Sequence, residues 1–144
     1  MPYVRRVVES VELSGKYKYA LLDVKIVDLK EGELPCLSGW HLDCTMHSEH
    51  ETKPETHHIF VWGAGCRTRF IVYPIEIPTA NGRLIEVNRA VREQKPEVFQ
   101  VGECTLTRYY RDNLHASSKA TKAGRRILIR ITETDLVKPN PIKL

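Results

Sequence analysis

The sequence has little that would direct the chain to a membrane, a secretory route or nucleic acid. No stretch approaches the roughly 18 to 20 apolar residues that a helix needs to cross a bilayer. Glu9 and Glu12 interrupt the segment where the apolar core of a signal peptide would lie, so we expect a cytoplasmic protein without membrane contact. The formal net charge is only +4 and no block of five like charges occurs, which argues against nucleic acid as a partner.

The sequence also lacks paired cysteines. The four cysteines are Cys36, Cys44, Cys66 and Cys104, and no two of them are closer than eight residues. Without a CxxC pair a zinc ribbon has no ligands, and a disulfide framework is not expected in a cytoplasmic chain of 144 residues. We therefore interpret each cysteine as a small, partly buried apolar residue.

The length and composition suit one globular domain. Hydrophobic residues make up 42% of the chain and charged residues 28%, and a folded domain of this size buries roughly two thirds of its surface. We expect a single domain over residues 1–137 and an exposed tail over 138–144, where two prolines prevent a strand.

Short runs with strand character dominate the chain. They cover residues 3–11, 17–27, 58–62, 68–77, 98–110 and 126–132. Only residues 85–95 have a helical pattern, which Pro96 ends, and the polar stretches 46–57 and 116–124 predict loops. Many short strands joined by short turns indicate a mostly β sandwich or barrel.

The segment Gly39-Trp40-His41-Leu42-Asp43 offers a pair of metal ligands. Residues i and i+2 of a strand point to the same face, so His41 and Asp43 can bind one ion together, while Trp40 faces the core on the other side. A third ligand must come from elsewhere in the fold. Five of the six histidines lie between residues 41 and 58, which leaves His115 alone near the C-terminal strands.

Two arginines follow His115 by eleven and fifteen residues. Alternation along the segment RILIRIT places Arg126 and Arg130 on one face and the isoleucines on the other. Arginines that face the interior of a sheet are costly unless each has an anionic partner, and a dicarboxylate matches the guanidinium fork. The alternative is that both arginines are exposed on an edge strand.

At these residues the chain resembles the iron- and 2-oxoglutarate-dependent oxygenases, whose pattern is HxD, a distant His and then an Arg about ten residues later. It is most similar to the taurine-dioxygenase-like branch, which has arginines about eleven and fifteen residues past the distal His. That branch also has a Thr after a Gly-rich turn some 25 residues beyond HxD. Thr68, in the segment GAGCRTRF, stands at this position. The resemblance covers residues 39–132.

The resemblance implies a double-stranded β-helix, or jelly roll, with one or two short helices. It implies that His41, Asp43 and His115 bind Fe(II), and that Arg126 and Thr68 anchor 2-oxoglutarate. Arg130 would contact either 2-oxoglutarate or an anionic substrate. The implied reaction couples oxidative decarboxylation of 2-oxoglutarate to hydroxylation of a small molecule or a side chain. Because family members are usually about twice this length, with extra helices over the sheet, two short chains can cover their sheets by pairing as a homodimer.

Two other functions fit the same residues. A cupin-like metal enzyme, such as an isomerase, would use the three ligands without 2-oxoglutarate. A jelly-roll module would bind a ligand or partner without redox chemistry, with His41 and Asp43 as surface residues and His115 as a loop histidine. The remaining histidines could line a loop over the site or form a second zinc site, although their spacing matches no closed structural zinc pattern. They are His47, His50, His57 and His58.

Overall fold

The computed structural model describes residues 2–36, 39–43, 55–77 and 84–135, and these contain two helices and seven strands. The helices are α1 (Pro2–Glu9) and α2 (Leu84–Gln94). The strands are β1 (Tyr19–Leu29), β2 (Thr56–Trp62), β3 (Thr68–Ile71), β4 (Val98–Gln100), β5 (Thr107–Tyr110), β6 (His115–Ser117) and β7 (Gly124–Thr134). The chain is therefore mostly β, as predicted. Neither helix has the length and apolar character needed to span a membrane.

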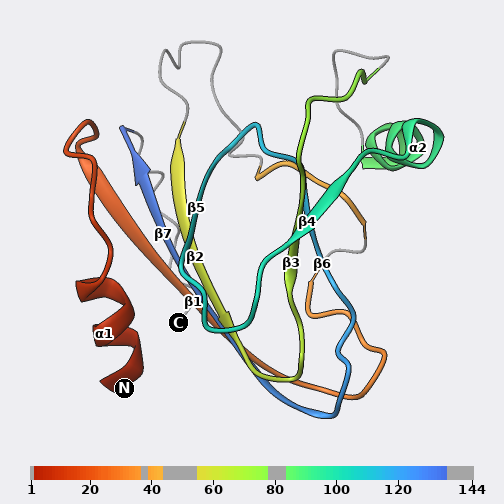
Figure 1. The fold of residues 1–144 in the computed structure, drawn as a ribbon. Helices are drawn as coiled ribbons and strands as arrows, with labels where there is room; N and C mark the ends of the chain where they lie inside the picture. The colour runs from red at the N-terminus through yellow and green to blue at the C-terminus, as the bar shows by residue number, and fades with distance from the viewer. Residues whose placement is uncertain (1, 37–38, 44–54, 78–83, 136–144) are drawn as a thin grey trace, which may run out of the picture.

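The strands form two antiparallel sheets (Figure 1). The larger sheet has the order β1-β7-β2-β5, and the smaller has the order β4-β3-β6. β7 lies inside the larger sheet, where it pairs with all eleven residues of β1 on one side and with β2 on the other. His41 extends the smaller sheet through a single bridge to His115 of β6.

The core lies between the two sheets. Ile59 and Tyr109 of the larger sheet pack with Phe70 of the smaller one. Leu128 of β7 packs against this cluster, whereas Ile129, one residue further along, is buried on the opposite face of the strand. The alternation predicted for β7 is thus confirmed, and its arginines share the inner face with Leu128.

The N-terminal segment is a helix, so the strand character assigned to residues 3–11 was wrong. Pro2 suits the first turn of α1, because a helix leaves that N–H unpaired in any case. Val4, Val7 and Val8 recur at helical spacing, and Val7 is buried. Val7 and Val8 are adjacent, which breaks the alternation of a strand, and contact with the larger sheet favours the helix.

Other bounds differ from the predicted ones. The run 68–77 is a strand only to Ile71, and 98–110 is two strands separated by a turn in which Cys104 has a φ of 60°. The loop predicted for 116–124 begins within β6, and the end of the loop predicted for 46–57 belongs to β2. The helix predicted for 85–95 is confirmed as α2, whereas the tail 138–144 lies outside the described residues.

Candidate metal centre

The three ligands selected from the sequence come together in the structure. One potential ligand atom from each of His41, Asp43 and His115 lies within 4.8 Å of the other two. The two histidines exchange backbone hydrogen bonds of 2.9 and 3.0 Å, and their ring centroids are 4.5 Å apart. The Nε2 atom of His115 lies 3.6 Å from Oδ2 of Asp43. Residues from two distant parts of the chain thus form one compact donor set.

Backbone carbonyls orient both imidazole rings. Nδ1 of His41 lies 3.1 Å from the carbonyl oxygen of Gly39, and Nδ1 of His115 lies 3.0 Å from that of Asn113. A carbonyl can only accept, so each Nδ1 carries the proton that it donates. A neutral ring held in this way has its lone pair on Nε2, which is then free to bind a metal.

The protonation states also suit a cation. Burial lowers the pKa of His115 below its usual range and outweighs the opposing effect of the Asp43 charge. Burial alone would raise the pKa of Asp43, but the Arg130 charge, with smaller effects from His115 and Tyr109, holds it below its usual value. At neutral pH the imidazole is therefore neutral and the carboxylate is charged, as metal binding requires.

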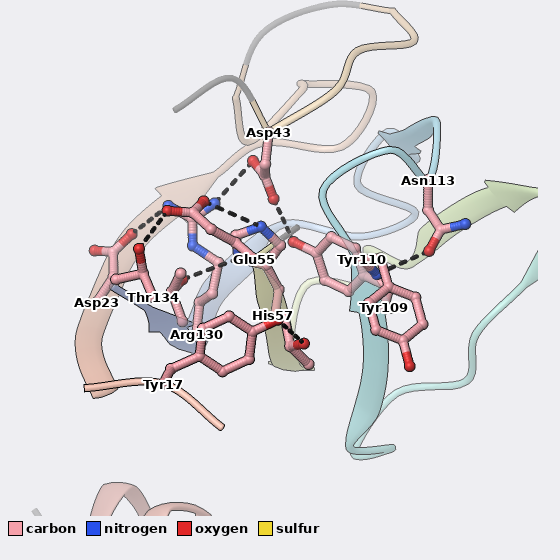
Figure 2. A network of polar contacts seen from close by, with 12 residues as sticks. Tyr17, Asp23, Asp43, Glu55, His57, Tyr109, Tyr110, Asn113, Arg130 and Thr134 are labelled. Carbon is pink, nitrogen blue, oxygen red and sulfur yellow. Dashed lines mark hydrogen bonds and ion pairs between the residues drawn. The ribbon is translucent and has the colours of Figure 1, made fainter. Parts of the chain in front are cut away.

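Arg130 and Tyr109 hold the carboxylate of Asp43 (Figure 2). Nη1 of Arg130 donates to Oδ1 of Asp43 at 2.8 Å, and Nη2 donates to Asp23 at 3.1 Å. The hydroxyl of Tyr109 donates to Oδ2 of Asp43. Arg130 is therefore engaged by two carboxylates, one of which is a candidate metal ligand.

His57 lies behind the centre, on β2 rather than in the loop over the site in which it was expected. Its Nδ1 is 2.9 Å from Oγ1 of Thr132, and its ring lies 5.0 Å from that of Tyr109. Its Nε2 is 3.9 Å from a carboxylate oxygen of Glu55. Burial lowers the pKa of His57 to about 4, so the ring is neutral. The signal that could have found it is the strand pattern of HIFVW, which continues back through His57.

Arg126 is buried on the same inner face as Arg130, four residues or ~13 Å earlier along β7. Only 1% of its surface is exposed, and its Nε and Nη1 atoms have no hydrogen-bond partner among the described residues. Thr68 is also buried, on β3 beside Ser117 of β6. A buried guanidinium with unused donors is costly, so this position favours an anionic ligand.

Helix α2 fixes the segment that carries His41. Oδ1 of Asn88 accepts from the backbone N–H of Trp40 at 2.8 Å, and Nδ2 donates to the carbonyl of Trp40 at 3.0 Å. Gly39 permits this approach: its φ is +97°, and a Cβ there would lie 2.4 Å from Asn88 Oδ1. The Trp40 side chain packs against the cluster that includes Val87 and Val91 of α2, which confirms its predicted place in the core.

The remaining histidines form no second site within the described parts of the chain. His58 follows His57 on β2 but faces the other side of the sheet, as alternation predicts. Its Nε2 lies 2.9 Å from Oε1 of Glu133, whose other oxygen accepts from Ser14. His47 and His50 lie outside the described residues.

Two imidazole nitrogens and one carboxylate oxygen make up the donor set of non-haem Fe(II) sites that keep open coordination positions. Searches against models of protein families, curated proteins and solved structures find no match to this chain. The function must therefore be argued from the site itself.

Proposed function

We propose that the protein is a small Fe(II)- and 2-oxoglutarate-dependent dioxygenase. The observation that carries the proposal is the convergence of His41, Asp43 and His115, with both Nδ1 atoms bound to carbonyls and both Nε2 atoms left for a metal. Bound Fe(II) would let dioxygen oxidise 2-oxoglutarate to succinate and carbon dioxide, with the second oxygen atom available to hydroxylate an unactivated carbon.

Arg126 is the residue that we assign to the distal carboxylate of 2-oxoglutarate. Its buried Nε and Nη1 atoms have no hydrogen-bond partner among the described residues, and a carboxylate would accept a charge-assisted hydrogen bond from one of them. The hydroxyl of Thr68, buried on the facing sheet, is the second donor in the proposal. Arg130 is the weaker candidate because Asp43 and Asp23 already engage its two terminal nitrogens.

The arrangement of the sheets supports the jelly-roll form of this proposal. The histidine ligands lie on the smaller sheet and its His41 extension, and the arginines lie on the facing side of the larger sheet. A ligand between the two sheets would therefore meet the metal at one end and Arg126 at the other.

The surrounding residues position the ligands and exclude water. Tyr109 and Arg130 hold opposite oxygens of Asp43, which leaves the carboxylate little freedom to rotate. The rings of Phe70 and Tyr109 lie 5.8 and 5.1 Å from that of His115. This apolar wall limits the access of water to the reacting centre from the core side.

Substitution of Arg126 by Met tests the cosubstrate assignment. Binding of 2-oxoglutarate to the Mn(II)-loaded protein should weaken about 30-fold or more, because a buried, hydrogen-bonded charge pair is lost. The ligand-free variant should be at least as stable as the parent, because Met removes unpaired buried donors. Arg125→Ala is the matched control, because Arg125 is next to Arg126 in the sequence but its guanidinium is exposed and bound to Asp28.

The outcome distinguishes the alternatives. Unchanged 2-oxoglutarate binding in Arg126→Met, with loss in Arg130→Met, would exchange the roles of the two arginines. Metal binding by the parent chain without 2-oxoglutarate binding would favour the cupin-like metal enzyme. If the parent chain bound neither, the non-catalytic module would be favoured.

A further inference from the structure

Strand β1 is an exposed edge with an apolar surface. It pairs with β7 on one side only, and no other described strand lies along its free side. Its pairing with β7 is continuous over eleven residues, without the proline or bulge that commonly protects an edge. Its exposed apolar side chains are Tyr19, Leu21, Leu22, Val24 and Ile26.

We propose that β1 pairs with β1 of a second copy of this chain, antiparallel and about a two-fold axis at Val24. The strand sequence is self-complementary about this residue: Asp23 faces Lys25 of the second copy, and Leu22 faces Ile26 of the second copy. Directly opposite residues of opposite charge stabilise an antiparallel pair. The axis repeats each contact, so the dimer gains two ion pairs and two Leu–Ile pairs.

The charges also exclude the neighbouring registers. A two-fold axis perpendicular to the sheet places the inner faces of both copies on the same side of the joined sheet. The register can therefore shift only in steps of two residues, which move the axis by one residue at a time. An axis at Asp23 would place that aspartate opposite itself, and an axis at Lys25 would place two lysines together. Like charges directly opposite destabilise a pair, which leaves Val24 favoured over both.

The apolar face of β1 would become continuous with that of its copy. Leu22, Val24 and Ile26 lie opposite Ile131, Ile129 and Ile127 of β7 on the outer face. Beside them, Leu22 and Val24 line an open groove with Val4 and Val8 of α1. Pairing at Val24 would join two such stripes side by side and withdraw their adjoining edges from water. The proposal does not require the metal-site function, because no candidate metal ligand contributes to the interface, although Asp23 also accepts a hydrogen bond from Arg130.

Lys25→Asp tests the pairing. Sedimentation equilibrium of the full parent chain at tens of micromolar should give twice the 16.6 kDa chain mass. In the variant, each ion pair becomes a pair of aspartates, so the dimer dissociation constant should rise at least about tenfold. Lys119→Asp makes the same charge change at an exposed position outside the strands and should leave the dimer intact. Thermal unfolding checks that each variant is folded.

A cysteine pair tests the register. Val24→Cys should give a disulfide-linked dimer under mild oxidation, because the residue faces itself across the axis. Leu22→Cys lies on the same face but would be separated from its copy by four residues, so it should not cross-link above the parent background. A monomeric parent chain, a dimer unaffected by Lys25→Asp, or cross-linking through Leu22→Cys rather than Val24→Cys would each overturn the proposal.

Discussion

Asn88→Ala tests whether Asn88 positions the candidate metal centre in addition to stabilising the fold. The Asn88 side chain forms two hydrogen bonds with the backbone of Trp40, next to His41. Nδ2 of Asn88 also donates to the carbonyl of Leu84 within α2. A hydrogen bond in a folded protein contributes roughly 0.5 to 1.5 kcal/mol, so the loss of all three should lower the free energy of unfolding by about 1.5 to 4.5 kcal/mol. Urea unfolding of the metal-free chain measures this change.

The same substitution should weaken metal binding. Loss of a group that orients metal ligands typically costs ten- to a hundredfold in affinity. We expect a loss near ~10-fold for Asn88→Ala, since Asn88 holds the backbone beside His41 rather than the imidazole itself. Titration with Mn(II), followed by the loss of the free-ion resonance signal, measures the affinity.

Gln94→Ala is a closely matched control on the same helix. Gln94 accepts from the backbone N–H of Glu76 at 3.1 Å and donates to its carbonyl at 2.7 Å, so it forms the same kind of double contact. Gln94→Ala should therefore lose about 1 to 3 kcal/mol of stability, from two hydrogen bonds, and retain the parent Mn(II) affinity. If both variants lost metal affinity equally, the reasoning that Asn88 positions His41 would be refuted.

Three further substitutions, each at a single residue, test other parts of the account. Tyr109→Phe should weaken Mn(II) binding about tenfold with little change in the unfolding midpoint, because one hydrogen bond to Asp43 is lost; unchanged affinity would contradict this role. Gly39→Ala should destabilise the chain by roughly 1 to 3 kcal/mol in urea unfolding, owing to its φ of +97° and the clash with Asn88. His57 has a folded-state pKa of about 4, below its unfolded value near 6.5. Because the unfolded chain binds the proton more readily, the His57 contribution to the free energy of unfolding is fully present above pH 6.5. About 3 kcal/mol of that free energy is lost as the pH falls towards 4. Urea midpoints should fall less steeply over this range in His57→Gln, and identical slopes would exclude the effect.

The alternating pattern made the central strands predictable. In β7 the arginines and Leu128 face inwards while Ile129 is buried on the other face, and this followed directly from the two-residue period. The same period placed His41 and Asp43 on one side and Trp40 on the other. These predictions needed only local geometry.

The errors arose where tertiary contacts decide the outcome. The β-branched valines of α1 suggested a strand although Val7 and Val8 are adjacent, and packing against the larger sheet selects the helix. His57 seemed to end a polar loop, but pairing with Thr132 of β7 draws it into β2. The contact between Arg130 and Asp43 joins residues 87 positions apart, and no spacing rule could reveal that the arginine faces a candidate metal ligand.

The most direct test of the proposed function is anaerobic calorimetry of 2-oxoglutarate binding to the chain loaded with Fe(II) or Mn(II), beside the metal-free chain. His115→Ala is the companion variant, since it removes one proposed metal ligand and leaves Arg126 in place. The account predicts metal-dependent binding to the parent chain and none to His115→Ala. Absence of binding in both metal states, or binding that is indifferent to the metal, would contradict it.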